Sequence, residues 1–278
     1  MKVLVTGATS LPGSAILREL ESRTIPCLGV DAPEFDVTKD ADVRRQVQEA
    51  APDVIIHCIP YTNMDKAESE PAECAGANGF GALTMARAAN EVGAKLVLLS
   101  TAQVFPGTAK RPNGINDPYG PRNVYGMSMV QAEDAVRSLM TRYYVVRTGP
   151  LFGGGKDAVR TALRASQDNR ELRLAGDRIA NPTYAPDLAK FLCSLINTNY
   201  YGIWHARNEG AYSPAEFAKL VIKKAGRTGR IVALPDTEMP PHARRTMDCR
   251  LAAELPAGFS PFPSVENALE RCLAEVSY

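Results

Sequence analysis

The chain has 278 residues and a hydrophobic content of 45%, which is enough for one large domain or for one domain with a smaller cap. A net charge of +1 does not favour nucleic acid or an anionic membrane as the main partner. No apolar run reaches the ~18 residues that a membrane span needs, and "MKVLVTGATS" lacks the features of a signal peptide, so we expect a cytoplasmic protein.

The first half of the chain alternates short β-rich runs with longer helical patterns. Strands are predicted at 2–7, 26–31, 53–59, 95–101 and 143–148, and helices at about 13–24, 40–50, 73–92 and 124–141. Continuous apolar runs of this length are typical of strands that are buried on both faces of a parallel sheet. Strict alternation of strand and helix therefore predicts an α/β fold with a Rossmann-type doubly wound parallel sheet.

After about residue 150 the pattern changes to a Gly-rich loop and two amphipathic helices, within "NPTYAPDLAKFLCSLI" and "YSPAEFAKLVIKKAG". In the second of these, Ser213 is the expected N-cap, Pro214 the first helical residue and Gly226 the end. We expect residues 151–278 to form a smaller α+β substrate-binding region that is interleaved with residues 1–150. The ligand crevice should lie between the two, at the carboxyl ends of the strands.

The first strand leads into a glycine-containing turn, "VLVTGATSLPGSAILREL". Gly7 permits a tight turn and Gly13 permits close packing of helix on strand, while the helix N-terminus offers N–H groups to a pyrophosphate. Ser10 stands where a middle glycine is usual, and its hydroxyl could donate to a phosphate oxygen. The turn predicts that residues 1–150 bind NAD(P), with these contacts: Gly7, Thr9, Ser10, Leu11 and Gly13.

Asp31 ends the second predicted strand, 18 residues after Gly13. A carboxylate at this place accepts hydrogen bonds from the adenosine ribose and repels a 2′-phosphate. No Arg or Lys follows it directly. We therefore favour NAD(H) over NADP(H); a solvated loop aspartate is the alternative.

The six cysteines and three histidines are widely scattered and form no CxxC pair. This spacing does not predict a metal site. Reduced, mostly packed thiols are the favoured interpretation.

Several segments together carry a family resemblance: "VTGATSLPG", "YTNMDKAESEP", "NGFGALTMARAANEVGAKLVLLSTAQVFPG", "NVYG", "NPTYAPDLA" and "EGAYSPAEFAKL". On these the chain resembles the extended short-chain dehydrogenases/reductases, and among them the dTDP-4-dehydrorhamnose reductases, over nearly its whole length. The resemblance implies an NADH-dependent reductase of a 4-keto-6-deoxy sugar nucleotide or a related ketone.

The resemblance also implies roles for individual residues. Thr101 would hydrogen-bond the substrate carbonyl, and Tyr125 would protonate the developing alkoxide and contact the cofactor. Asn78 would lie near the site. The other residues that it places along the cofactor are Asp36, Val37, Cys58, Ile59 and Pro60, and those that it places at the substrate are Gln103, Pro150, Arg244 and Arg245.

Two departures from the family pattern bear on function. The family's lysine, four residues after the tyrosine, is Met129 here, so its contact with the nicotinamide ribose and its charge are absent. The Ser-Trp pair that often follows Arg-Thr is Gly149-Pro150.

Ala102 and Gln103 replace the acidic pair of sugar-nucleotide dehydratases, which argues against dehydratase chemistry.

Three functions therefore stay open. The leading hypothesis is the reductase, with a nucleotide sugar as its small-molecule partner and a possible homodimer as its assembly. The second is a cofactor-binding but redox-silent protein that acts as a regulatory subunit, by analogy with the β subunit of methionine adenosyltransferase. The third is non-redox chemistry, such as isomerisation or ring closure, that retains Tyr125.

Overall fold

The computed structural model describes residues 1–58, 61–240 and 243–275. Its centre is a six-stranded sheet of order β10-β5-β4-β3-β1-β2, and every neighbouring pair is parallel. The strands are β1 (Val3–Thr6), β2 (Cys27–Val30), β3 (Val54–Cys58), β4 (Lys95–Thr101), β5 (Tyr143–Thr148) and β10 (Gly202–Ala206). The predicted doubly wound sheet is confirmed, with five strands where they were expected.

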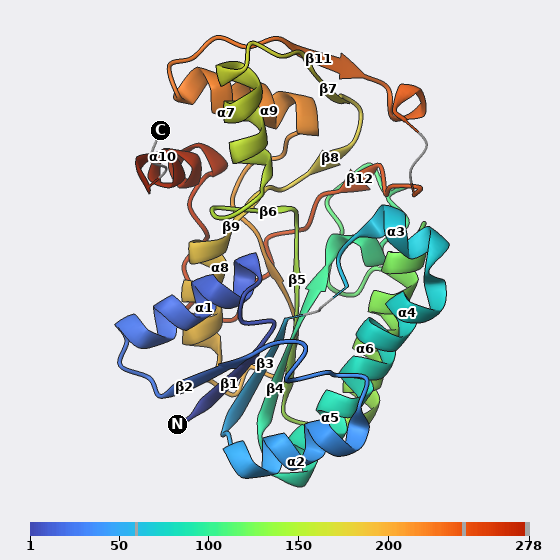
Figure 1. Cartoon of the computed structure of the whole chain (residues 1–278), viewed down its shortest axis with the longest axis vertical. Coiled ribbons are helices and arrows are strands. Elements are labelled where there is room, and N and C mark those ends of the chain that lie inside the picture. The colour runs from blue at the N-terminus through green and yellow to red at the C-terminus, as the bar shows by residue number, and fades with distance from the viewer. Residues whose placement is uncertain (59–60, 241–242, 276–278) are drawn as a thin grey trace.

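Helices cover both faces of this sheet (Figure 1). Helices α1 (Leu11–Ser22) and α8 (Ala185–Leu195) pack on one face, and α2 (Asp40–Ala50), α5 (Gly81–Glu91) and α6 (Val124–Leu139) lie on the other. Successive strand residues point to opposite faces, so Val3 and Val5 join the α1–α8 core while Leu4 joins the α5–α6 core. Burial on both faces is the reason that the strands read as continuous apolar runs.

The single helix predicted at 73–92 is composite. Short helices α3 (Met64–Ser69) and α4 (Pro71–Ala75) lead into a π-helical turn, η1 (Gly76–Phe80), and then into α5. A π-turn inserts an extra residue into a helix and is frequent at functional sites. Asn78 lies on this turn, fully buried.

The second half adds a region beyond the carboxyl ends of the strands (Figure 1). Helices α7 (Ala158–Gln167), α9 (Pro214–Lys224) and α10 (Val265–Glu275) share an apolar core. Ser213 caps α9 in a capping box with Glu216, and Gly226 follows with φ +63°, as predicted.

Short strand pairs connect this region to the sheet. They are β7 (Leu172–Ala175) with β11 (Ile231–Leu234), β6 (Leu151–Phe152) with β9 (Thr183–Tyr184), and β8 (Ile179–Ala180) with β12 (Asp248–Cys249). The 3₁₀ turns are η2 (Ala102–Val104) and η3 (Asp236–Glu238). The chain re-enters the central sheet through α8 and β10, so the two sequence halves share one sheet.

Candidate active site

A cavity of about 360 Å³ opens at the carboxyl ends of β4 and β5, beside the first turn of α1. Four of the residues predicted for catalysis or substrate, Thr101, Gln103, Tyr125 and Pro150, line it, together with the predicted cofactor residues Ser10 and Leu11. The remaining lining residues are Pro12, Thr62, Met64, Leu99, Ser100, Ala102, Thr148, Gly149, Leu151 and Cys249. None of these described lining residues carries a charged side chain.

Tyr125 and Thr101 meet in this cavity. Thr101 is the last residue of β4, and its Oγ1 accepts the Gln103 N–H at 3.2 Å. Tyr125 lies in the first turn of α6, which Asn123 caps by accepting the Gly126 N–H at 2.7 Å. Burial raises the pKa of the Tyr125 phenol to about 12, against the smaller lowering effect of its hydrogen bond with Thr101. The phenol is therefore protonated at neutral pH and is able to act as an acid.

Met129 is fully buried and is part of the apolar core that α6 shares with α5. It lies one helical turn after Tyr125, as the sequence predicts, but it is absent from the residues that line the cavity. A flexible thioether is well suited to fill such a core. Met129 is thus a packing residue in this protein.

The glycine turn has the shape that a dinucleotide needs. Gly7 has φ +66°, and a Cβ on Gly13 would lie 2.1 Å from the Gly7 carbonyl oxygen, so both positions require glycine. The helix begins at Leu11, earlier than predicted, with Ser10 as its N-cap. The Ser10 hydroxyl donates to the Gly7 carbonyl at 2.5 Å and accepts the Gly13 N–H at 3.1 Å, so its one proton is used inside the turn rather than offered to a phosphate.

Asp31 is joined to this turn by hydrogen bonds. Its carboxylate accepts the Thr9 N–H at 2.9 Å, the Thr9 hydroxyl at 2.5 Å and the Ala32 N–H at 3.0 Å. Burial acts in the opposite direction, but these hydrogen bonds outweigh it and hold the pKa of the Asp31 carboxyl below its usual value. A fixed, ionised carboxylate beside the glycine turn fits the expected ribose contact.

The other predicted cofactor residues have varied surroundings. Asp36 accepts the Thr38 N–H at 3.0 Å and the Thr38 hydroxyl at 2.7 Å, while Val37 is buried against Gly81. Cys58 is buried directly beneath Gly7. Ile59 and Pro60 lie outside the described residues.

Asn78 organises the loop after β3. Its amide accepts the Tyr61 N–H at 3.1 Å and donates to the Tyr61 carbonyl at 2.9 Å and to the Ser128 hydroxyl at 3.0 Å. Ser128 in turn donates to the Tyr125 carbonyl at 2.7 Å. Asn78 therefore connects the cofactor-side loop to the helix that carries Tyr125.

Arg147, which lies on β5 behind the cavity, is a structural residue. It is 1% exposed and forms an ion pair with the fully buried Glu133 at 2.7 Å. Ser100 and Tyr119 donate to the same carboxylate at 2.5 and 2.7 Å. This network holds α6 against β4 and β5 behind the cavity.

The two predicted substrate arginines do not line the cavity. Arg245 forms an ion pair with Asp65 at 2.6 Å, and Arg244 is exposed, with its carbonyl accepting the Asn123 side-chain amide at 2.7 Å. Their substrate role stays a prediction. Thr148 and Cys249 line the cavity although the sequence did not single them out, because only the strand register places them there.

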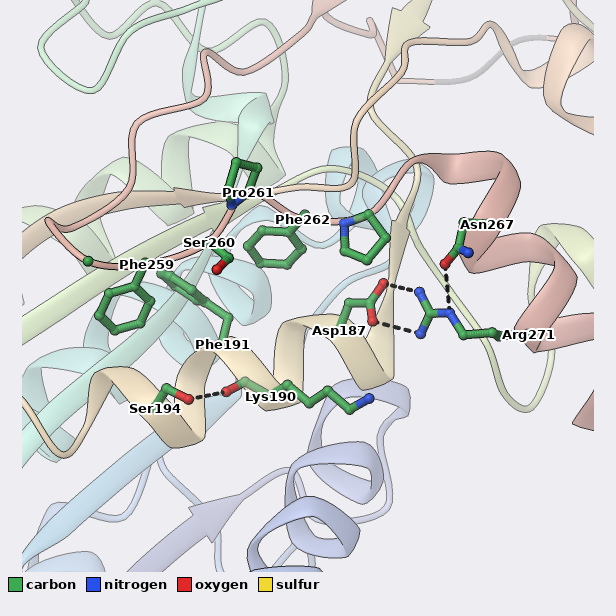
Figure 2. Close-up of a pocket in the computed structure, with 12 residues that line it drawn as sticks. Asp187, Lys190, Phe191, Ser194, Phe259, Ser260, Pro261, Phe262, Asn267 and Arg271 are labelled. Atoms are coloured by element: carbon green, nitrogen blue, oxygen red, sulfur yellow. Dashed lines mark hydrogen bonds and ion pairs between the residues drawn. The ribbon is translucent and has the colours of Figure 1, made fainter.

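A larger cavity of about 540 Å³ lies elsewhere, between α8 and the loop before α10 (Figure 2). Arg271 forms two hydrogen bonds with the Asp187 carboxylate, at 2.8 and 2.6 Å, and the ring of Phe191 packs against Phe259 and Phe262. None of the predicted site residues lines it. These contacts attach α10 and its preceding loop to the sheet domain.

Two further searches concern only the described part of the chain. Its histidines, cysteines and carboxylates form no group of three or more that could hold a metal ion. None of its helices combines the length and apolarity required to cross a membrane. All six cysteines are free thiols.

Comparison with known proteins gives consistent matches. The family model described as the RmlD substrate binding domain matches residues 1–278. The dTDP-4-dehydrorhamnose reductase of Streptomyces griseus is 37% identical over 74% of this chain and 70% of its own length. That of Sinorhizobium fredii is 33% identical over 90% and 88%.

Solved structures match equally well. The dTDP-4-dehydrorhamnose reductase of Bacillus anthracis, in complex with NADP, has a TM-score of 0.96 at 33% identity and covers 99% of both chains. The UDP-glucose 4-epimerase of Thermus thermophilus, in complex with NAD, has a TM-score of 0.85 at 18% identity over 99% of this chain and 98% of its own. The second likeness concerns the fold alone.

Proposed function

Because the chain belongs to the RmlD substrate-binding domain family, and with it to the NAD(P)-dependent oxidoreductases of the extended short-chain dehydrogenase/reductase type, we propose that it reduces the ketone of a dTDP-linked 4-keto-6-deoxy sugar. The observation that carries this proposal is the Thr101–Tyr125 pair, which lies beside the glycine turn in a cavity whose described lining residues are all uncharged. Burial keeps the phenol protonated, which is the state that ketone reduction requires.

In the proposed reaction, bound NADH supplies the hydride that adds to the carbonyl carbon. Thr101 donates a hydrogen bond to the carbonyl oxygen and fixes its position. Tyr125 transfers its phenolic proton to that oxygen as the alkoxide develops, and solvent later reprotonates the phenolate. The product is the secondary alcohol.

The absence of a charged side chain from the described lining residues gives this chemistry a direction. Alcohol oxidation needs a phenolate base, and a phenol with a pKa of about 12 is seldom ionised near pH 7. Reduction starts from the protonated phenol and has no such requirement. The site is thus better suited to reduction than to its reverse.

The proposed cofactor is NADH, and Asp31 of this chain is the support for that preference. Its ionised carboxylate, held by Thr9 and Ala32, would accept the ribose hydroxyls and repel a 2′-phosphate. The Bacillus anthracis relative was crystallised with NADP, so the preference rests on the chemistry at Asp31 and not on the likeness.

The test is NADH oxidation with a panel of dTDP-4-keto-6-deoxy sugars, by wild type and by Tyr125→Phe. We expect measurable turnover by wild type and a loss of about 10²-fold or more in the variant, since the phenolic proton is required. The reductase proposal would be contradicted if the wild-type protein bound NADH normally but oxidised no NADH with any ketone of the panel.

A second candidate is a redox-silent or non-redox protein, and the burial of Met129 favours it. Without a lysine at position 129, neither its contact with the ribose nor its stabilisation of a developing oxyanion by charge is available. In that case NADH would bind and remain reduced. A regulatory subunit, an isomerase and a ring-closing enzyme are the functions that this candidate comprises.

We also propose that residues 1–150 bind NAD(P) and that residues 151–278 bind the substrate. Two further proposals are a cytoplasmic location and a homodimer. Light scattering on the purified protein measures the last of these.

A further inference from the structure

Thr148 has an unused hydroxyl at the active site. It is the last residue of β5, it is 5% exposed, and it lines the same cavity as Thr101 and Tyr125. Its Oγ1 is fully covered, and within the described residues it has no hydrogen-bond partner. Thr183, a buried threonine of the neighbouring β9, in contrast donates to the Asn181 carbonyl at 3.1 Å.

Sheet register places this hydroxyl beside Thr101. Thr148 of β5 is paired with Thr101 of β4 in the parallel ladder. Paired residues of parallel strands project from the same face, and neighbouring strands lie about 4.8 Å apart. The two threonines therefore form an adjacent pair at the carboxyl edge of the sheet, and both side chains border the cavity.

The backbone around Thr148 is closely packed, whereas its hydroxyl is not held by a hydrogen bond within the described residues. A Cβ at Gly149 would lie 2.0 Å from the Asn181 carbonyl oxygen, so the chain after Thr148 is packed directly on another backbone segment. No hydrogen bond among the described residues holds the Thr148 rotamer. A rotation about χ1 that exchanges the hydroxyl with the methyl group would present the hydroxyl to the cavity, and the role proposed below for Thr148 includes this rotation.

A buried hydroxyl without a partner is unfavourable, and buried polar groups are nearly always hydrogen-bonded. A buried polar group that has no partner in a native protein needs an explanation. One explanation is a ligand group that completes the hydrogen bond when it binds. The cavity is the site of the proposed reaction, and none of its described lining residues carries a charge that would stabilise an oxyanion. A hydroxyl donor would supply part of that stabilisation.

We propose that Thr148 is a catalytic residue that donates a second hydrogen bond to the ketone oxygen, beside Thr101 and Tyr125. This inference rests on the proposed reductase function. In this proposal the hydroxyls of Thr101 and Thr148, at the ends of β4 and β5, provide part of the oxyanion stabilisation that Met129 does not provide. The ligand group is a carbonyl oxygen that gains negative charge during the reaction.

Three variants test this inference. Thr148→Val removes the hydroxyl and keeps the shape, and Thr148→Ser keeps the hydroxyl. Thr84→Val is the matched control, because Thr84 is fully buried on α5, also lacks a partner among the described residues, and does not line the cavity. Turnover, KM, NADH affinity and the thermal unfolding midpoint are measured for each.

We expect Thr148→Val to lower kcat by about 10- to 100-fold while KM and NADH affinity stay within about twofold. Its unfolding midpoint should not fall, because no hydrogen bond within the described residues is lost. Thr148→Ser should recover most of the activity, and Thr84→Val should match wild type.

The inference would be overturned if Thr148→Val had the same kcat as wild type. It would also be overturned if the substitution changed only the affinity for NADH, because the hydroxyl would then contact the nicotinamide carboxamide. If wild type shows no turnover at all, the reductase proposal fails separately. The hydroxyl is then judged by calorimetric binding of dTDP-rhamnose to the protein with NAD⁺. About tenfold weaker binding by Thr148→Val supports the ligand contact, and unchanged or undetectable binding in both proteins overturns it.

Discussion

Met129→Lys tests directly how a methionine at this position, in place of the lysine that the family resemblance predicts, affects Tyr125. Positions 125 and 129 are one helical turn apart on α6, so their Cβ atoms are about 5–6 Å apart. Met129 itself is fully buried in the α5–α6 core. A lysine there must extend its ammonium from the core toward the cavity that Tyr125 lines.

Simple electrostatics gives the size of the effect. Two unit charges about 6 Å apart, at an effective dielectric constant of about 20, interact by about 2.8 kcal/mol, or about two pKa units. The ammonium would therefore lower the pKa of Tyr125 from its value of about 12, and it would stabilise the developing oxyanion. We expect kcat for reduction to rise by about 10- to 100-fold, at a cost in unfolding free energy of about 1–3 kcal/mol, because a charge is introduced next to apolar core.

The assay is NADH oxidation with the keto-sugar panel across pH, together with urea denaturation. Reduction uses the protonated phenol, so the rate falls as pH rises through the pKa of Tyr125. Because the lysine lowers that pKa, the alkaline fall in rate should move to lower pH in the variant. Met129→Leu controls for the loss of methionine, and Met127→Lys adds the same charge at a position that is 48% exposed.

One result would refute the reasoning. If Met129→Lys folds and binds NADH as wild type does, yet has neither a higher rate nor a displaced alkaline limb, the ammonium does not act on Tyr125. No activity in wild type or in the lysine variant, with normal NADH binding, would leave the redox-silent and non-redox functions.

Three other predictions concern cofactor choice and stability. Asp31→Ser should raise NADPH affinity by about tenfold or more relative to NADH in fluorescence titrations, because the repelling carboxylate is removed; an unchanged ratio would show that Asp31 does not select the cofactor. Glu133→Gln should lower the free energy of unfolding by about 3–5 kcal/mol, since Arg147 stays buried without its ion-pair partner, while Asp134→Asn, at an exposed neighbour, should change it by less than about 0.5 kcal/mol. Burial lowers the pKa of His57 to about 4, so between this value and 6.5 the unfolded state binds more protons than the folded state, and the free energy of unfolding falls as pH is lowered. In urea denaturation at pH 7 and pH 5, His57→Asn should weaken this fall by up to about 1.4 kcal/mol per pH unit. An unaltered dependence of the unfolding free energy on pH would contradict the lowered pKa of His57.

The features that the sequence predicted well are those set by neighbouring residues. Strand runs, the Ser213 capping box and the tight turn at Gly7 depend on side-chain periodicity, hydrogen bonds three residues apart and the sterics of one residue. The structure agrees with them closely. Helix α1 begins earlier than the sequence predicts because its N-cap is Ser10, for which the sequence predicts a ligand contact and not a cap.

The composite helix shows the limit of local patterns. A run with helical periodicity at 73–92 does not reveal the π-turn at Gly76–Phe80, which contacts α6. Asn78 was expected near the site. That its amide connects the Tyr61 backbone to Ser128 follows only from three segments meeting in space.

By itself, the sequence determined the doubly wound sheet, the glycine turn with Asp31, and the Thr101–Tyr125 pair with a methionine one turn later. Only the tertiary structure decided that Met129 is packed in the core, that Arg147 is paired with Glu133, and that Thr148 lies beside Thr101 with a hydroxyl that has no partner among residues 1–58, 61–240 and 243–275. The physical reason is that strand order and register bring together residues that are 14 to 47 positions apart, whereas propensity and periodicity act over a few residues.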